Sequence, residues 1–377
     1  MADLTTQEAA VLEQISRNPF AGQQEIADAL GIARSTVAAH IVQLIKQGHI
    51  LGRGYVLPEP GHIVCIGGAV FDRKHRLQSP LAMETSNPVD SVHSFGGVAR
   101  NVAESLALLG ERPLFISAVG DDQTGQHLLN HLRGRGVDLS GVIMVPGQIT
   151  AEYSAVLSPD GQLVFGMDNM RLFDLLTPAA LARIWSHLAA ASWVFAETNL
   201  PAETLEALIR RQGGGRYKLA IDAVSIGKVR KLPNDLTGID LLFLNADEAA
   251  ILLSGARATT LDEAMDAAQA LQGKGAGMVQ LSLGSKGVVI AGEGTQTTLP
   301  SIPATVIDLT GAGDAMVAGT LHSLLSGKDL AAAAALGNLM SALTIETTGT
   351  VRADLSLATL ESHARMRMPA PSAGQPA

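Results

Sequence analysis

The chain has 377 residues, of which 47% are hydrophobic and 17% charged, and its formal net charge at pH 7 is −9. This composition indicates a globular protein of about two domains, and the negative charge argues against binding nucleic acid through one large basic surface. The single cysteine, Cys65, excludes an intrachain disulfide and a thiolate zinc site. Because neither a secretory signal nor an 18-residue apolar run is found, we expect a cytoplasmic protein without membrane contact.

The N-terminal region has the pattern of three helices. Apolar residues recur at helical spacing over 9–15, and Asn18 marks the end of this first helix. A short second helix ends at Gly31, and a third, with an apolar stripe over 37–45, ends before Gly48. This order predicts a helix-turn-helix.

Two β-prone pieces around Gly52, Arg53 and Gly54 suit a hairpin, so the helix-turn-helix is expected to carry a wing. We therefore predict a winged helix-turn-helix domain over 1–57 and a linker over 58–61. A second domain is expected over 62–367, followed by a disordered Pro/Ala-rich tail over 368–377.

DNA binding is the role that we favour for the first domain, although it carries one more acidic than basic side chain. The segment 33–55 contains basic residues and no acid, which makes the third helix and the wing locally basic. A recognition helix reads bases from its N-terminal residues. The candidate contacts are Arg34, Ser35, Thr36, His40 and Arg53. The alternative is a winged helix that serves only in dimerisation or packs on the second domain.

The second domain alternates short apolar, β-rich runs with helical stretches. These runs lie at 62–68, 113–120, 191–199, 218–224, 240–248 and 277–284. Near-continuous apolar strands joined by helices predict an α/β fold with a mainly parallel sheet covered on both faces. The segments 70–77 and 150–168 differ, because their polar residues alternate and a turn is indicated at 159–161. We expect them to form a small separate β-sheet that acts as a lid.

The stretch "DLTGAGD" at 308–314 has the features of an anion site. Gly311, Ala312 and Gly313 precede a helical run, and successive N–H groups at a helix N-terminus attract anions. Asp314 in the first turn could take a proton from an attacking hydroxyl. Alternatively, Asp314 is only an acid that stabilises a helix N-terminus. The chain has neither a G-x-x-x-x-G-K-[ST] loop nor a dinucleotide fingerprint.

Four motifs, in order, resemble those of the ribokinase-like, or PfkB, carbohydrate and nucleoside kinases. They are "SFGGVARNVAESLALLG" at 94–110, "NADE" at 245–248, "LSLGSKGVVI" at 281–290 and "VIDLTGAGDAMVAG" at 306–319. The resemblance implies a ribokinase-like fold, with ATP and Mg²⁺ used to phosphorylate a hydroxyl group.

The segment "TSNPVDSVHSFGGVARN" at 85–101 is most similar to the pseudouridine kinase subgroup, some bacterial members of which carry an N-terminal helix-turn-helix. This implies transfer to the 5′-hydroxyl of pseudouridine. The alternatives are a kinase for another nucleoside or sugar, and a transcriptional regulator that keeps the kinase fold as a ligand sensor. The lid strands and the winged helix both suit a homodimer.

The resemblance also implies roles for individual residues. Asp314 matches the catalytic base, and the N–H groups of Gly311, Ala312 and Gly313 match the anion hole. The positions that match sugar-binding residues are Asp72, Gly97 and Asn101, and those that match the ATP site are Asn245, Ser282, Gly284 and Asn338. Glu248 matches a residue that organises Mg²⁺ through water, and a loop that binds K⁺ in some relatives is matched by Asp308, Thr310, Thr344 and Gly349.

Three alternatives stay open. Asn101 could be a polar residue near the start of an ordinary helix, and Asn245 with Glu248 could be an N-cap and a first-turn acid without a metal. Glu152 and Asn169 are either substrate neighbours or solvated strand residues, of which we favour the second.

Overall fold

The computed structural model describes residues 4–18, 21–51, 61–211, 215–292 and 294–367. Arg53, the predicted hairpin beyond Leu51, most of the 58–61 linker and the tail over 368–377 lie outside these residues. Among the described residues, no helix combines the length and apolar character needed to cross a membrane.

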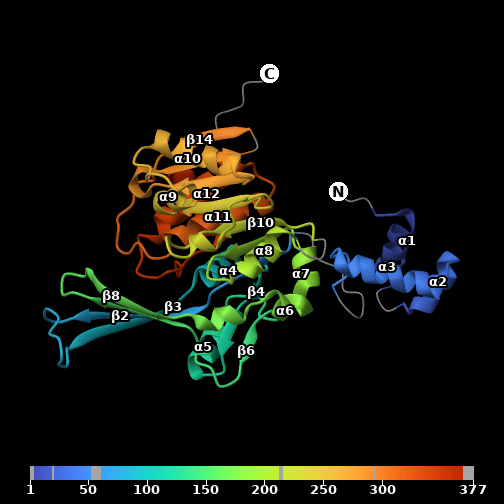
Figure 1. Cartoon of the computed structure of the whole chain (residues 1–377), viewed down its shortest axis with the longest axis horizontal. Helices are drawn as coiled ribbons and strands as arrows, with labels where there is room; N and C mark the ends of the chain where they lie inside the picture. The colour runs from blue at the N-terminus through green and yellow to red at the C-terminus, as the bar shows by residue number, and fades with distance from the viewer. Residues whose placement is uncertain (1–3, 19–20, 52–60, 212–214, 293, 368–377) are drawn as a thin grey trace.

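The predicted helix-turn-helix is present at the N-terminal end (Figure 1). It consists of α1 (Thr6–Arg17), α2 (Gln23–Leu30) and α3 (Arg34–Lys46). A capping box between Thr5 and Glu8 starts α1, and Gly31, with a φ of 65°, ends α2 in the left-handed conformation that glycine tolerates. The helices enclose a small core of their own, which includes Val11, Ile26 and Leu44.

The second domain is built on an eight-stranded sheet of order β14-β13-β12-β11-β10-β9-β1-β4. The strands are β1 (Ile63–Ile66), β4 (Leu114–Ile116), β9 (Trp193–Glu197), β10 (Lys218–Asp222), β11 (Leu241–Asn245), β12 (Met278–Ser282), β13 (Val288–Gly292) and β14 (Thr295–Leu299). All pairs are parallel except β12 with β13 and β13 with β14, so the predicted parallel sheet is confirmed with an antiparallel edge.

Helices cover both faces of this sheet, as its apolar strands require. One face is covered by α7 (Trp185–Ala190), α8 (Ala202–Ile209), α9 (Ala246–Leu253) and α10 (Leu261–Gly273). The other is covered by α4 (Val98–Leu108), α5 (Gln123–Gly134), α11 (Ala312–Leu325), α12 (Leu330–Thr344) and α13 (Leu357–Arg367). The short α6 (Pro178–Leu181) and 3₁₀ turns at Arg171–Leu175, Ala182–Ile184, Val229–Lys231 and Gly284–Lys286 complete the helical segments.

A four-stranded sheet of order β3-β2-β7-β8 projects from the core as the predicted lid (Figure 1). Its strands are β2 (Val70–Leu77), β3 (Val89–Gly96), β7 (Glu152–Leu157) and β8 (Leu163–Asn169). The turn predicted at 159–161 joins β7 to β8, with the Gly161 N–H donating to the Ser158 carbonyl at 2.9 Å. The sequence did not indicate β3, because its residues run into the double glycine at 96–97 and lie within the motif at 85–101, which gives no strand pattern of its own.

The run at 113–120 was expected to be one strand but forms two. After β4 the chain breaks at Ser117, whose hydroxyl donates to the Gly67 carbonyl at 2.7 Å. It then continues as β5 (Ala118–Gly120), which pairs with β6 (Ile143–Val145) in a separate two-stranded sheet.

The turn after α3 rests directly on helix α7 of the second domain. A Cβ atom at Gly48 would collide with the backbone of Ala189 and Ala190, so glycine permits this close approach. Beside it, the Arg216 guanidinium donates to His49 Nδ1 at 2.7 Å, and burial lowers the pKa of His49.

Candidate functional site

Three adjoining cavities meet around the first turn of α11. The largest, about 630 Å³, is here called the apolar cavity, because its walls include Val306, Leu309 and Met316. The acidic cavity, about 150 Å³, is lined by Asp222, Glu248 and Asp314 among others. The lid cavity, about 260 Å³, lies between β2 and the core. Gly313 lines the first two and Asp314 the last two, so α11 is their common wall.

The apolar cavity brings together three residues expected at the ATP site. Ser282 is the last residue of β12, Gly284 starts the next turn and Asn338 lies on α12, and all three line this cavity. The Asn338 Nδ2 donates to the Pro300 carbonyl at 2.8 Å, which fixes the amide in a largely apolar wall. A pocket with apolar walls and few oriented polar groups suits a planar base.

Asn245 and Glu248 form the N-cap of α9, which is the alternative to a metal-binding role for this pair. Asn245 Oδ1 accepts from the Glu248 N–H at 3.0 Å, and Glu248 accepts from the Asn245 N–H and side-chain amide, each at 2.8 Å. Both residues also line the acidic cavity, so the cap fixes their orientation toward it without deciding a metal role.

The acidic cavity concentrates negative charge. Burial raises the pKa of Asp222 well above its usual range, and the carboxylates of Asp314 and Glu248 raise it further. Burial also raises the pKa of Glu248. Among the residues that the structure describes, no three His, Cys, Asp or Glu side chains converge closely enough to hold a metal by themselves. The oxygen donors here suit a cation that keeps part of its water shell, as Mg²⁺ does.

The predicted anion hole lies at the N-terminus of α11. Gly311 is the N-cap with a φ of 82°, and a Cβ atom there would collide with the Thr350 carbonyl, so glycine is required. The Ala312 N–H makes a long 3.3 Å contact to the Leu309 carbonyl. In the described part of the chain, no backbone acceptor takes the N–H of Gly311 or Gly313, and a Gly313 side chain would meet open space.

Asp314 is held by Asn101, which shows that Asn101 is more than an ordinary helix residue. The Asn101 Nδ2 donates to Asp314 Oδ2 at 2.5 Å, although the two residues are 213 positions apart. Burial raises the pKa of Asp314 to about 6, while the Asn101 hydrogen bond and the Arg100 charge oppose the rise. A carboxylate with a pKa near the working pH can act as a general base.

Arg100, whose role the sequence did not reveal, organises this pair. It is only 2% exposed, and its guanidinium donates to Glu104 at 2.5 Å, to the Phe95 carbonyl at 2.8 Å and to the Asn101 side-chain oxygen. With its oxygen bound by Arg100, the Asn101 amide must present its NH₂ group to Asp314. The signal was available, since Arg100 directly precedes Asn101 within the quoted motif.

Asp72 and the double glycine form one wall of the lid cavity. A Cβ atom at Gly96 would collide with the Asp72 carboxylate, and one at Gly97, with a φ of 97°, would collide with the Gly68 carbonyl. Burial raises the pKa of Asp72 to about 6. The structure therefore brings Asp72, Gly97 and Asn101 together with Asp314, as predicted.

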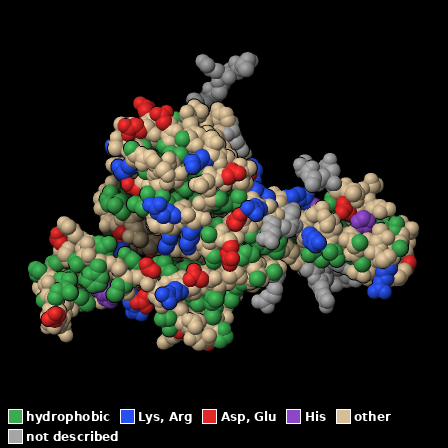
Figure 2. All heavy atoms as spheres, in the orientation of Figure 1, with side chains coloured by type: hydrophobic (Ala, Val, Ile, Leu, Met, Phe, Trp, Pro, Cys, Tyr) green, Lys and Arg blue, Asp and Glu red, His purple; other side chains and the backbone are tan. Residues whose placement is uncertain are grey.

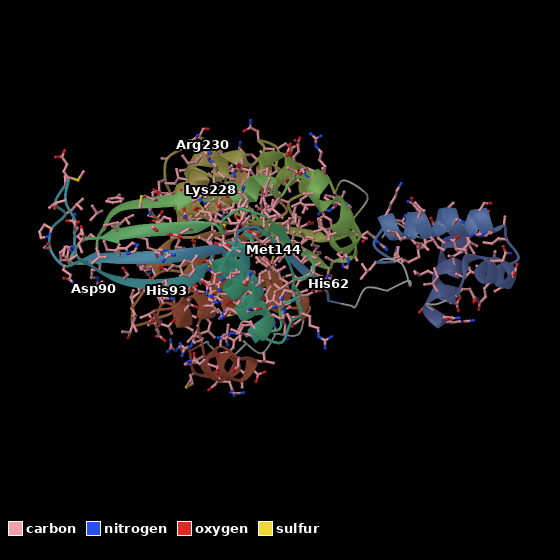
Figure 3. All side chains as sticks on the ribbon, turned by 90° about the horizontal axis from the view of Figure 1, so that it is seen from below. His62, Asp90, His93, Met144, Lys228 and Arg230 are labelled. Atoms are coloured by element: carbon pink, nitrogen blue, oxygen red, sulfur yellow. The ribbon has the colours of Figure 1, made fainter. Side chains whose placement is uncertain are left out.

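Two lysines that the sequence analysis passed over also line the lid cavity. Lys74 lies on β2, and Lys228 lies on the core, with Met170 Sδ 3.5 Å from its Nζ. Figure 3 shows Lys228 on the core, whereas Asp90 and His93 lie out along β3 of the lid. Glu152 and Asn169 do not line this cavity; Glu152 pairs instead with Arg73 at 2.8 Å, on the opposite face of the strand from Asp72.

The residues expected to bind K⁺ are already engaged by groups of the protein itself. The Lys74 ammonium lies 2.7 Å from Asp308 Oδ2 and 3.2 Å from Thr310 Oγ1, where a cation would be needed. The Thr344 carbonyl already accepts from the N–H and hydroxyl of Thr347, at 3.0 and 2.9 Å. Gly349 lies in the following turn.

Two acids at strand ends, the buried Glu197 and the half-buried Asp222, were not indicated by the sequence motifs. Glu197 ends β9 and accepts from the Gly68 and Asn199 N–H groups, both at 2.6 Å, while Asp222 ends β10. Ligands of open α/β sheets bind at the carboxyl ends of the strands. An acid closing an apolar run, as in "WVFAE" and "KLAID", was therefore a usable signal.

The DNA-contact candidates on α3 differ in availability. Arg34 and Ser35 are exposed and Thr36 is half-buried at the helix start. The His40 ring nitrogen lies 3.3 Å from the Gln7 side-chain oxygen of α1, so this histidine is partly engaged within the domain.

Comparison with known proteins agrees with this geometry. The model of the pfkB family carbohydrate kinases matches residues 61–356, and that of winged helix-turn-helix DNA-binding domains matches residues 5–50. The chain is 34% identical over 325 residues to the uncharacterized sugar kinase YeiI of Escherichia coli K12, covering 86% of this chain and 89% of that protein.

Two further relatives extend the comparison. The Escherichia coli K12 pseudouridine kinase is 30% identical over 307 residues, covering 81% of this chain and 96% of that protein. The structure of Arabidopsis thaliana ribokinase complexed with ribose and ATP superposes with a TM-score of 0.72 at 22% identity, covering 81% and 98% of the two chains. The chain therefore belongs to the pfkB family of carbohydrate kinases, phosphotransferases with an alcohol group as acceptor, and carries a winged helix-turn-helix domain ahead of its kinase domain.

Proposed function

We propose that the protein transfers the γ-phosphoryl group of ATP to the 5′-hydroxyl of pseudouridine, giving pseudouridine 5′-phosphate and ADP. The observation that carries the proposal is the position of Asp314, which lines both the acidic cavity and the lid cavity. A hydroxyl entering from the lid side and a phosphoryl group entering from the other side would meet at this carboxylate. The similarity to a pseudouridine kinase supports the choice of acceptor.

In this mechanism each residue acts by position or charge. Asn101 holds Asp314 Oδ2 and leaves Oδ1 to accept the proton of the attacking hydroxyl, whose oxygen forms the new bond to phosphorus as the bond to ADP breaks. The N–H groups of Gly311 and Gly313 face the growing charge on the phosphoryl oxygens. Asp72 and Asn101 would hold the sugar hydroxyls, and Ser282, Gly284 and Asn338 would hold the nucleotide.

Asn245, Glu248 and Asp222 would hold Mg²⁺ at the acidic cavity, chiefly through water. Bound there, the ion would neutralise phosphate charge beside α11. The buried, mutually repelling carboxylates support this assignment, because a cation would relieve their repulsion.

The test is an acceptor screen. ADP formation is measured with pseudouridine, uridine, ribose, adenosine and fructose 6-phosphate under identical conditions. We expect pseudouridine to give the highest kcat/KM. Turnover of another acceptor without turnover of pseudouridine would refute this substrate and leave the family assignment intact.

A second proposed function is sequence-specific DNA binding by the winged helix-turn-helix domain, which the family match over residues 5–50 and the exposed Arg34 and Ser35 support. A mobility shift on DNA upstream of the protein's own gene, with and without pseudouridine, tests it. Arg34→Ala should weaken binding and lower its salt dependence. The absence of any shift at low salt would argue against this role. A shift that depends on the nucleoside, together with no kinase turnover, would favour a ligand-sensing regulator instead.

We also propose a homodimer that pairs through the lid. Figure 2 shows hydrophobic side chains gathered on the projecting lid, where Val92, Leu163 and Met167 are exposed. Contiguous exposed apolar surface favours protein contacts. Analytical ultracentrifugation of the protein and of Met167→Glu would test this, with a shift of the variant to monomer expected.

A further inference from the structure

Both oxygens of the Asp308 carboxylate accept hydrogen bonds from donors of the protein itself. Its Oδ1 accepts from the N–H and the hydroxyl of Thr310, at 2.9 and 2.6 Å, and its Oδ2 accepts from the Lys74 ammonium at 2.7 Å. The same ammonium donates to the Thr310 hydroxyl at 3.2 Å. The segment that leads into the anion hole is thus neutralised by a side chain 234 residues away.

Lys74 reaches this segment from the lid. It lies on β2 two residues after Asp72, so both side chains share the face of the strand that lines the lid cavity. Its side chain is 31% exposed and that of Asp308 25%, so the pair is partly shielded from solvent and from screening by salt. Burial opposes ionisation of Asp308, but the hydrogen bonds from Lys74 and Thr310 leave its pKa below its usual range.

A monovalent cation at the same carboxylate would meet a like charge. It would have to bind Asp308 beside the ammonium, and the Thr344 carbonyl that it would also need already accepts two hydrogen bonds from Thr347. K⁺ and Lys74 therefore compete for one position.

We propose that Lys74 is the resident counter-ion of the Asp308–Thr310 segment, so that the lid supplies the charge that K⁺ supplies in some relatives and turnover does not depend on K⁺. The turnover part of this proposal rests on the proposed kinase function. Because Lys74 belongs to the lid strand β2, its ammonium can reach the Asp308–Thr310 segment only when the lid lies over the cavity.

The first test compares turnover in KCl with turnover in choline chloride at equal ionic strength. The wild-type rates should agree within about twofold, because an internal ion pair needs no added cation. Lys74→Met should lose about tenfold or more in choline chloride and regain part of the loss in KCl. Lys74→Arg, which keeps the charge, should stay independent of K⁺. A wild-type requirement for K⁺ would overturn the proposal, and this comparison needs no variant to fold.

Arg73→Met is the matched control. Arg73 is the neighbouring cation on β2, lies on the opposite face and pairs with Glu152 rather than with Asp308. Its variant should respond to KCl and choline chloride as the wild type does. If Arg73→Met acquires K⁺ dependence as Lys74→Met does, the effect is a general property of lid charge and the proposal is wrong.

The second test measures thermal unfolding without ATP or acceptor, so that it remains valid if no acceptor is turned over. The wild-type midpoint should be the same in KCl and choline chloride, whereas that of Lys74→Met should rise in KCl alone. A K⁺-specific rise in the wild type would contradict the proposal independently of the catalytic function.

Discussion

The apolar cavity and the lid cavity meet at α11 but are built from different materials. The apolar cavity is formed within the core domain by side chains such as Ser282, Ala304 and Met316, together with the Asn338 amide. The lid cavity depends on ionised side chains from the lid and the core, among them Asp72, Lys74 and Lys228. The difference indicates that the cavity proposed for the nucleotide is shaped mainly by apolar packing, whereas the cavity proposed for the acceptor is shaped by charge and by the lid.

The largest effect should follow removal of the carboxylate that the acidic and lid cavities share. Asp314→Asn should lower kcat by about 10²-fold or more, because the amide cannot accept the proton. The KM for ATP should change little, since the apolar cavity is untouched. Steady-state ADP formation measures both, and a near-normal kcat would refute the base assignment.

Loss of Arg100 should be the next largest effect, and it should fall on the lid cavity. In Arg100→Met the Asn101 amide is free to rotate, so kcat should fall by about tenfold or more. The variant also leaves the buried Glu104 without its closest partner, since the Arg100 guanidinium lies 2.5 Å from its carboxylate, so the free energy of unfolding should drop. The acid limb of kcat should move to higher pH, because the Arg100 charge lowers the pKa of Asp314 and Asp72.

The pH profile distinguishes this role from a structural one. Arg100→Lys keeps a charge and should retain the wild-type limb while losing part of kcat. A profile for Arg100→Met that is unshifted despite a normal fold by circular dichroism would show that Arg100 acts on stability alone.

The wild-type pH profile should show the charged character of the shared site. With the pKa of Asp314 raised to about 6, kcat/KM should fall about tenfold per pH unit below that value as the base becomes protonated. Asp72 titrates in the same range, and Glu197, Asp222 and Arg100 also act on Asp314, so the limb reports the group as a whole.

Stability should change in the opposite direction over this range. A raised pKa means that the folded state disfavours the charged carboxylate, so the contribution to stability is present below the usual pKa of 3.8 and is lost as pH rises through about 6. Thermal unfolding between pH 4 and 7 measures this change in stability. An acid limb of kcat/KM well below pH 5 would contradict the argument that burial raises the pKa of Asp314.

The smallest effect should come from the apolar cavity. Asn338→Ala removes one oriented amide and should raise the KM for ATP by about fivefold, the worth of one hydrogen bond. The KM for the acceptor should not change. If the KM for the acceptor rises instead, ATP and the acceptor are not divided between the apolar cavity and the lid cavity as proposed.

The residues proposed to bind the nucleotide could be predicted from the sequence because local motifs contain them. Ser282 and Gly284 lie at the end of the predicted apolar run 277–284, and Gly311 to Gly313 precede a predicted helix, so each position could be located from its neighbours in the sequence. Gly97 and Asn101 were predicted from the motif that contains them, and Asp72 from its matching position after the first strand of the second domain.

The rest of the acceptor half depends on pairs that no local pattern reveals. Lys74 on the lid strand β2 contacts Asp308 on the core, and β3 is defined only by its register with β2. Periodicity gives the faces of a strand but not its partner in space. For this reason the K⁺ prediction did not include Lys74. The motif that contains Asp308 carries no information about which lid residue lies beside it.

The contact of Gly48 with α7 joins the two domains through directly packed backbone. The chain passes from α7 into β9 over residues 191–192, and β9 ends at Glu197, which holds the Gly68 N–H at the edge of the lid cavity. A fully buried central strand transmits displacement with little compliance. If the winged helix binds DNA as proposed, a force applied to it would therefore reach the wall of the lid cavity along one strand.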